Sequence, residues 1–198
     1  KAPSNPALQT EAAKAKRALD NARYYDEARR FALLLSQGCQ TENGCKLVII
    51  TGGGPGIMEA ANRGAADVGA QSIGLNIVLP MEQEPNPYIT PELCFQFHYF
   101  AIRKMHFLMR AKALVAFPGG FGTFDELFET LTLIQTKKIR AVPILLFGRA
   151  YWQRVINFDA MVEEGMIAAA DLELFRYVET AEEASEAVYE FYSKNNTS

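Results

Sequence analysis

Apolar residues recur along the chain with two different periods, and the two periods alternate. Over residues 6–37 they fall three or four positions apart, as on one face of a helix. The short β-branched run over 47–50 is typical of a strand that is buried on both faces. By the same criteria we expect further helices over 57–68, 99–112, 123–137, 151–164 and 181–193, and further strands over 72–78, 94–97, 113–117, 142–147 and near Tyr177.

This alternation of strands and helices predicts the fold class. It is typical of an α/β protein with a Rossmann-like, doubly wound and mainly parallel sheet that carries helices on both faces. We expect a single domain over residues 1–198, because no linker, repeat or low-complexity segment interrupts the pattern. Folds of this class usually open with a strand, whereas this chain opens with a helix, so we expect a first strand upstream of Lys1.

The amino-acid composition argues against several classes of binding partner. The net charge is −3, which argues against a nucleic-acid polymer because such a partner selects basic surfaces. Apolar runs such as 31–35 and 113–117 fall far short of the roughly 18 residues of a membrane helix, so we expect no membrane as a partner. The three cysteines form no C-x-x-C pair, and two histidines are too few for a zinc site. We therefore expect a cytoplasmic protein with reduced thiols and no bound metal.

Two glycine-rich segments follow predicted strands and lead directly into predicted helices. They are Thr51-Gly52-Gly53-Gly54-Pro55-Gly56 and Pro118-Gly119-Gly120-Phe121-Gly122. A helix N-terminus presents unpaired N–H groups and a partial positive charge, and glycine lets the backbone approach an anion closely. One such segment alone is equally typical of a tight turn between strand and helix. Two in one short chain favour a phosphorylated ligand bound between them.

Two common nucleotide-binding fingerprints are absent from these segments. A dinucleotide-binding loop requires G-x-G-x-x-G, and the sixth position is not glycine in the registers that start at Gly52, Gly54 and Gly120. No acidic residue ends the second predicted strand, where a ribose-binding carboxylate is expected. No G-x-x-x-x-G-K-[ST] run exists either. The sequence therefore favours neither NAD nor a P-loop nucleotide, and we expect no cofactor.

Taken together, the two segments resemble the paired motifs of the LOG (Lonely Guy) family of cytokinin riboside 5′-monophosphate phosphoribohydrolases, whose members are often mislabelled lysine decarboxylases. The family motifs are G-G-G-x-x-G-x-M and P-G-G-x-G-T-x-x-E. The second is complete over 118–126, and the first matches from its second position, with Thr51 in place of the leading glycine. The Arg103-Lys104 pair between the motifs also matches. The resemblance covers about 24–192, and the 83–88 segment is similar to the longer bacterial members.

The resemblance implies a nucleotide-binding domain that hydrolyses the N-glycosidic bond of adenosine 5′-monophosphates, plain or N6-modified, to free base and ribose 5-phosphate. It implies that Glu126 activates water and stabilises the cationic sugar, and that Arg103 grips the ligand and supports charge on the leaving base. Position alone favours other roles. The pattern Thr123-x-x-Glu126 is a capping box, and Arg103 is explained equally well as a helix-surface residue in a weak ion pair.

The remaining site residues that the resemblance implies bind the substrate. We expect the N–H groups of the second segment and the Thr123 hydroxyl to hold the phosphate, the first segment to line the nucleotide, and Glu59 to contact the ribose. The set is Gly53, Gly54, Gly56, Glu59, Lys104, Gly119, Gly120, Gly122 and Thr123. Simpler explanations exist for some of them: Glu59 favours the helix dipole, Lys104 is solvated, and Asn62 either binds ligand or caps locally.

A second function fits the same fold. Proteins similar to it carry molybdenum cofactor without hydrolysing nucleotides, so a non-catalytic binding or carrier protein is the alternative. Lysine decarboxylation normally uses a Schiff-base lysine with pyridoxal phosphate, and neither glycine segment contains a lysine, so we reject that activity. The resemblance also implies a homodimer or larger homo-oligomer. The aromatic run over 95–100 and the apolar segment 128–134 are candidates for either core or interface.

Overall fold

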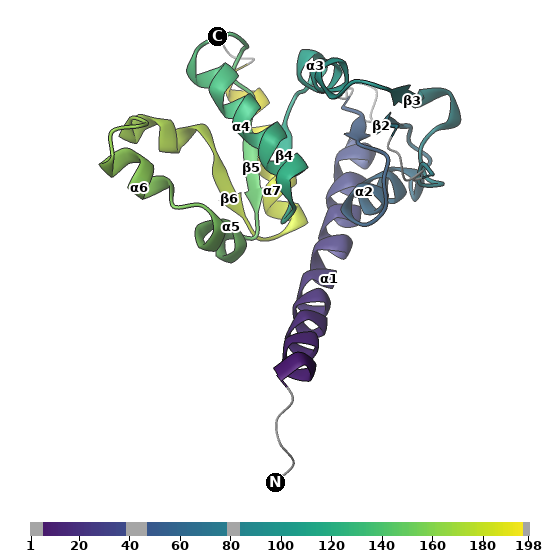
Figure 1. Ribbon diagram of the computed structural model, residues 1–198. Coiled ribbons are helices and arrows are strands. Elements are labelled where there is room, and N and C mark those ends of the chain that lie inside the picture. The colour runs from purple at the N-terminus through teal and green to yellow at the C-terminus, as the bar shows by residue number, and fades with distance from the viewer. Residues whose placement is uncertain (1–5, 39–46, 79–83, 196–198) are drawn as a thin grey trace.

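The computed structural model describes residues 6–38, 47–78 and 84–195 (Figure 1). Its helices are α1 (Pro6–Gly38), α2 (Ile57–Ala66), α3 (Phe100–Arg110), α4 (Phe121–Gln135), α5 (Arg149–Val155), α6 (Phe158–Glu163) and α7 (Ala181–Asn195), with 3₁₀ turns η1 (Pro91–Leu93) and η2 (Ala169–Leu174). Its strands are β1 (Ile49–Thr51), β2 (Ser72–Ile77), β3 (Cys94–Phe97), β4 (Leu114–Ala116), β5 (Ile144–Phe147) and β6 (Arg176–Val178). Helices and strands therefore alternate along most of the chain, as predicted.

The strands form two parallel sheets. Their orders are β1-β2-β3 and β4-β5-β6, and every pair is parallel. The α/β class with parallel pairing is thus confirmed. The predicted sheet is nevertheless divided, because β1 does not pair with β4. Each of these two strands has one edge without a partner strand among the described residues.

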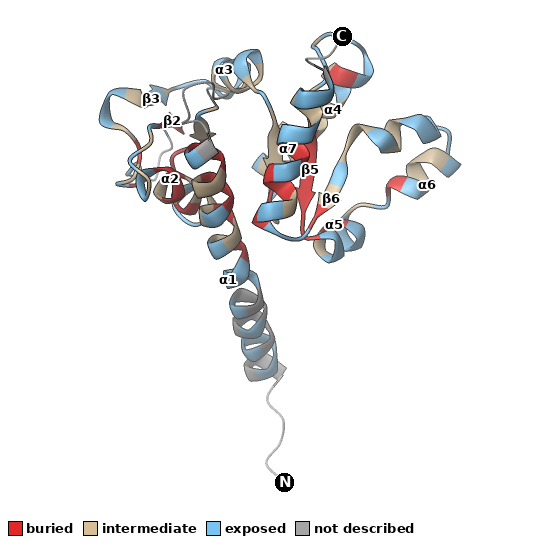
Figure 2. Cartoon of the chain, turned by 180° about the vertical axis from the view of Figure 1, so that it is seen from behind, coloured by how far each residue is buried: buried red, intermediate tan, exposed pale blue. Residues whose placement is uncertain are grey.

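Strand β5 shows how helices cover both faces of the second sheet. Leu145 and Phe147 pack into a core formed with α1 and α7, whereas Ile144 and Leu146 pack with α4 and α5. All four side chains are at most 2% exposed, because successive strand residues point to opposite faces and both faces are covered (Figure 2). The prediction of helices on both faces is confirmed for this sheet.

Helices α1 and α7 also join the two sheets. The core that contains Leu145 and Phe147 extends to Ile49 of β1 and to Val115 of β4. A single apolar cluster therefore spans both sheets, although no strand ladder connects them within the described ranges.

The predicted helix over 151–164 is wrong as a single helix. Helix α5 ends at Val155 and α6 begins at Phe158. The side-chain oxygen of Asn157 accepts a hydrogen bond from the N–H of Ala160 at 3.0 Å and so caps a new helix. The turn expected over 39–46, with Cys39 and Cys45, lies outside the described residues. None of the described helices is both long and apolar enough to span a membrane.

Helix α3 packs little of its surface against the rest of the chain. None of its residues is buried, and Figure 2 colours it exposed and intermediate throughout. The side chains of Phe100, Ile102, Met105 and Met109 are 48–71% exposed. Tyr99, just before the helix, is 70% exposed, so the core interpretation of this aromatic run is wrong for Tyr99 and Phe100.

Candidate active site

The two glycine loops lie at the carboxyl ends of parallel strands, where α/β proteins usually bind ligands. The first loop (residues 52–56) connects β1 to α2, and the second loop (residues 117–120) connects β4 to α4. The two loops belong to different sheets, so a site that uses both needs side chains that reach from one to the other. Helices α3 and α4 supply them.

Arg103 of α3 links the first loop to α4, the helix that follows the second loop. Its Nε donates to the carbonyl oxygen of Leu75 in β2 at 2.7 Å, which fixes the side chain. Its guanidinium lies against the first loop, since a Cβ added to Gly52 would lie 2.6 Å from Nη2. Its Nη1 lies 3.4 Å from Oε1 of Glu126 on α4. The structure thus brings together the two predicted catalytic residues.

Burial dominates the electrostatics of this ion pair. The side chains of Arg103 and Glu126 are 11% and 33% exposed. Burial lowers the pKa of the Arg103 guanidinium, although Glu126 opposes that shift. Burial also raises the pKa of the Glu126 carboxyl, an effect that Arg103 opposes and Asp125 increases. The 3.4 Å separation exceeds the about 2.7–2.9 Å of a charge-assisted hydrogen bond, so the pair is loose and both groups retain bonding capacity for a ligand.

The first loop is held in place by hydrogen bonds to its own backbone. Gly53 has φ +76, and its N–H donates to the Thr51 hydroxyl at 3.0 Å. The side-chain amide of Asn86 donates to the carbonyls of Gly53 and Gly54, both at 3.1 Å. The Asn76 side chain fills the space over Gly53, where an added Cβ would lie 2.7 Å from its Cγ. These contacts leave the loop with little freedom to change shape.

Asn62 supports this loop from behind. It is fully buried, and its Oδ1 accepts from the Thr51 hydroxyl at 2.7 Å and from Asn86 Nδ2 at 3.0 Å. Its Nδ2 donates to the Ser72 hydroxyl at 3.0 Å. Both ends of the amide are therefore occupied within the protein, and the two roles considered for Asn62, ligand contact and a local cap, are wrong.

The second loop begins α4 without a side-chain cap. The N-cap residue is Gly120, and no side chain bonds the N–H groups of the first turn. The predicted capping box is therefore wrong. Thr123 lies within the first turn and packs against Gly119, where an added Cβ would lie 2.9 Å from the Thr123 Cβ. The carboxylate of Glu126 does not cap the helix and instead pairs with Arg103.

Two glycines of this segment are not required by the packing of the described chain. A Cβ at Gly120 or Gly122 would meet no other atom within 4 Å, and neither glycine has a positive φ. Their bare Cα atoms leave room for something outside the chain to approach the backbone. Open N–H groups at a helix start combined with that access suit a phosphate.

Glu59 lies in the first turn of α2. Its Oε1 accepts a hydrogen bond from the hydroxyl of Tyr25 in α1 at 3.0 Å. This contact holds the carboxylate at the junction of α1 and α2. Its contact with a ribose stays a prediction.

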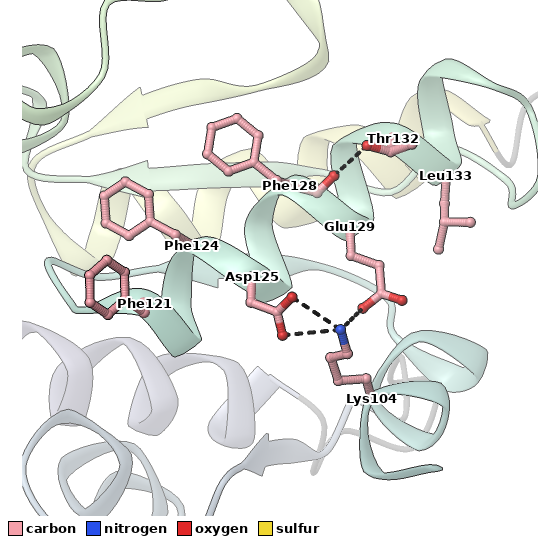
Figure 3. Close-up of a pocket in the computed structure, with 8 residues that line it drawn as sticks. All are labelled: Lys104, Phe121, Phe124, Asp125, Phe128, Glu129, Thr132 and Leu133. Atoms are coloured by element: carbon pink, nitrogen blue, oxygen red, sulfur yellow. Dashed lines mark hydrogen bonds and ion pairs between the residues drawn. The ribbon is translucent and has the colours of Figure 1, made fainter. Parts of the chain in front are cut away.

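A hollow of about 660 Å³ lies along the exposed side of α4 (Figure 3). Its lining consists of Lys104, Phe121, Phe124, Asp125, Phe128, Glu129, Thr132 and Leu133. The Nζ of Lys104 lies 3.0 Å from Asp125 and 3.1 Å from Glu129. The Arg103–Glu126 pair does not line this hollow, so Lys104 is engaged beside the pair rather than with it. The role of Lys104 in substrate binding stays a prediction.

Residues that shape the two loops carry no signal in the sequence patterns. Tyr151 of α5 donates its hydroxyl to the carbonyl of Gly119 at 2.5 Å, as Asn86 does for the first loop. Each acts on a backbone group more than 30 positions away, a distance that local periodicity does not register. Within the described ranges, no group of three or more His, Cys, Asp and Glu residues could hold a metal ion.

Comparisons with known proteins identify relatives of this chain. The family described as possible lysine decarboxylase matches residues 58–188. The cytokinin riboside 5′-monophosphate phosphoribohydrolase LOG4 of Arabidopsis thaliana is 30% identical over 149 residues, which are 73% of this chain and 67% of that protein. The Arabidopsis thaliana LOG3 enzyme is 28% identical over 148 residues, with the same coverage. The probable cytokinin riboside 5′-monophosphate phosphoribohydrolase LOG4 of Oryza sativa subsp. japonica is 30% identical over 140 residues, which are 69% of this chain and 59% of that protein.

The fold has a solved counterpart. The Moco carrier protein from Chlamydomonas reinhardtii superposes with a TM-score of 0.58 at 18% identity, covering 87% of this chain and 89% of that chain. At this identity the likeness concerns the fold alone. The family match, by contrast, spans more than half of the sequence and includes both Arg103 and Glu126. The chain therefore belongs to the LOG family, which is also described as possible lysine decarboxylases.

Proposed function

We propose that this protein hydrolyses the N-glycosidic bond of adenosine 5′-monophosphates, plain or N6-modified, to free base and ribose 5-phosphate. The observation that carries the proposal is the Arg103–Glu126 pair, a loose and largely buried pair that connects the first glycine loop to α4, the helix that follows the second loop. Relatives named as cytokinin riboside 5′-monophosphate phosphoribohydrolases support the same chemistry.

In this proposal the substrate lies between the loops. The 5′-phosphate binds the open N–H groups of the second loop and of the first turn of α4, together with the Thr123 hydroxyl. The glycines of the first loop line the nucleotide on the other side. Glu59 contacts the ribose hydroxyls, and Lys104 adds positive charge near the phosphate.

The proposed reaction uses water and side chains. A water oxygen bonds to C1′ of the ribose while the bond from C1′ to the base nitrogen breaks, and the electron pair of that bond leaves with the base. The sugar is oxocarbenium-like at the transition state, which the Glu126 carboxylate stabilises. Glu126 accepts one proton from the water and later releases it to solvent, and the departing base takes up one proton from solvent, so atoms and charge balance. Its raised pKa makes the Glu126 carboxylate a better proton acceptor than an ordinary glutamate.

The alternative function is a non-catalytic protein that binds a nucleotide or molybdenum cofactor. Its support is the fold shared with the Moco carrier protein. Glu126 favours the hydrolase, because a carrier of an anionic ligand gains nothing from a half-buried carboxylate beside its binding arginine. The experiment below separates the two functions.

The direct test is release of base from a nucleotide. The protein is incubated with AMP and with isopentenyladenosine 5′-monophosphate, and free base is followed by chromatography. We expect Glu126→Gln to lower turnover by about 10²–10⁴-fold, the usual loss of an acid–base group. The matched control is Glu186→Gln, the same change at an exposed position on α7, which should keep its activity. Nucleotide binding without release of base would support the carrier.

We also propose a cytoplasmic homodimer or larger homo-oligomer. The exposed apolar residues of α3 support it, since contiguous apolar surface often marks an interface. In the segment 128–134, Phe128, Leu131 and Ile134 pack in the core, whereas Leu133 lines the hollow along α4. Light scattering during size-exclusion chromatography tests the assembly, and a monomer at all concentrations would count against it.

A further inference from the structure

Tyr151 contacts the second glycine loop from outside it. Its hydroxyl donates to the carbonyl oxygen of Gly119 at 2.5 Å. The contact crosses from the segment after β5 to the segment after β4, two neighbouring strands of the same sheet. Parallel strands place these segments side by side, so the tyrosine reaches the loop without any distortion of the backbone.

Neighbouring contacts hold the Tyr151 side chain in a fixed position. Its ring packs edge-on against Trp152 at 5.2 Å, and Trp152 is fully buried. The indole N–H of Trp152 donates to the carbonyl of Phe147 at 3.0 Å, and the N–H of Tyr151 donates to the carbonyl of Gly148 at 3.0 Å. The hydroxyl is therefore presented to the loop from a fixed position.

Peptide geometry converts this contact into an orientation of the loop. The Gly119–Gly120 peptide is trans and planar, so the carbonyl of Gly119 and the N–H of Gly120 point in opposite directions. When the Tyr151 hydroxyl holds the carbonyl, the N–H of Gly120 is directed away from α5. Gly120 is also the N-cap of the uncapped first turn of α4, and it is one of the two glycines whose Cα atoms are unobstructed.

We propose that Tyr151 is a positioning residue for anion binding: it fixes the Gly119–Gly120 peptide so that the N–H of Gly120 joins the first-turn amides of α4 around the 5′-phosphate. This inference rests on the proposed function for the identity of the anion. The residue touches the loop and not the reacting bond. Its loss should therefore weaken binding of phosphorylated ligands and leave the chemical step in place.

The test is Tyr151→Phe, which removes one oxygen atom and keeps the ring against Trp152. The matched control is Tyr192→Phe, because the Tyr192 hydroxyl also donates to a backbone carbonyl, that of Lys112, at 2.5 Å. Lys112 precedes β4, at the end of the strand opposite to the glycine loop. Thermal melting of both variants verifies that they are folded at the assay temperature.

Binding of ribose 5-phosphate is measured by calorimetry, and AMP hydrolysis by release of base. For Tyr151→Phe we expect the KM for AMP and the Kd for ribose 5-phosphate to rise by about tenfold while kcat changes little, the pattern of lost binding rather than lost catalysis. Tyr192→Phe should leave all three constants unchanged. Unchanged KM and Kd in Tyr151→Phe, an equal rise in Tyr192→Phe, or a fall confined to kcat would each overturn the assignment.

The two proposals fail in different ways. Wild-type protein that binds AMP without releasing base, with weaker binding in Tyr151→Phe, supports the role of Tyr151 and overturns the hydrolase. Wild-type protein that releases base, with Tyr151→Phe indistinguishable from it, supports the hydrolase and overturns the role of Tyr151. Wild-type protein that neither binds ribose 5-phosphate or AMP nor releases base overturns both.

Discussion

The two glycine loops have similar sequences, but the fold requires glycine in the first loop and does not require Gly120 or Gly122 in the second segment. In the first loop the fold itself requires glycine, because Gly53 has φ +76 and the Asn76 side chain occupies the place of a Cβ. In the second segment the described chain makes no such demand on Gly120 or Gly122, which have ordinary φ and open space. The comparison teaches that a glycine-rich motif does not by itself identify the surface that meets the ligand. Open space at a glycine with ordinary φ is what the fold leaves unexplained, and under the proposed function it is where the phosphate approaches.

The strongest test of this contrast is Gly53→Ala. We expect it to lower the free energy of unfolding by about 2–5 kcal/mol, from a left-handed alanine and from overlap with Asn76. Urea denaturation measures the loss. Gly56→Ala is the matched control, since Gly56 has φ +73 and ψ −126 but nothing within 4 Å, and should cost about 1–3 kcal/mol from backbone strain alone. Equal losses at the two positions would show that the contact with Asn76 does not matter.

The hydrogen bonds that hold each loop provide the next test. Asn86→Ala removes the side-chain amide that donates to the carbonyls of Gly53 and Gly54, whereas the backbone N–H of residue 86 still donates to the Gly53 carbonyl at 2.8 Å, so the change should cost about 1–3 kcal/mol. Tyr151→Phe removes one bond from the second loop and should cost about 0.5–1.5 kcal/mol. Chemical denaturation of the two variants measures both losses in the free energy of unfolding. If the tyrosine proved the more costly, the first loop would not be the more firmly held of the two.

Gly122→Ala should separate stability from binding. Alanine is the better helix former by about 1 kcal/mol, and nothing nearby obstructs its Cβ, so the unfolding free energy should rise by up to that amount. Affinity for ribose 5-phosphate should fall at the same time, because the methyl group occupies space that the anion needs. Calorimetry with the folded variant measures this affinity. Unchanged affinity would mean that the second loop is not the anion site.

The smallest expected effect concerns pH. Burial raises the pKa of Glu126 above its ordinary value, so kcat/KM for AMP should fall as acid protonates the carboxylate at a higher pH than usual. Asp125→Asn removes a negative charge that adds to this rise, so the acid limb should move to lower pH. The stability effect has the opposite sign. A raised carboxyl pKa favours the folded state at low pH, and that contribution is lost as pH rises through the raised pKa. A limb that does not move in Asp125→Asn would exclude Glu126 as the titrating group.

Periodicity predicted most elements of this fold because most of them bury apolar residues at regular spacing. It placed β3 at its observed bounds and located α1, α2, α3, α4 and α7 to within a few residues. It merged α5 and α6 because the break depends on one capping side chain, Asn157, and not on a change of apolar spacing. It did not foresee two separate sheets, since pairing between strands is a matter of tertiary arrangement.

The candidate site was predictable in part. The motifs indicated Arg103 and Glu126, and the structure brings them within 3.4 Å. Position alone favoured a cap for Glu126, an interpretation that fails because the N-cap of α4 is Gly120 rather than Thr123. Asn86 and Tyr151 escaped prediction because they act through backbone carbonyls, and any residue type can supply a carbonyl.

The open space at Gly122 has an evolutionary consequence. Under the proposed function, a substitution there that strengthens the helix is not opposed by folding, so only selection on the ligand keeps the position a glycine. A descendant could therefore lose the ligand and keep the fold in a single step. Proteins that share this fold can therefore diverge in the ligands they bind while their cores stay intact. Under the proposed function, a glycine without neighbouring atoms at this helix start marks the members that still bind the anion.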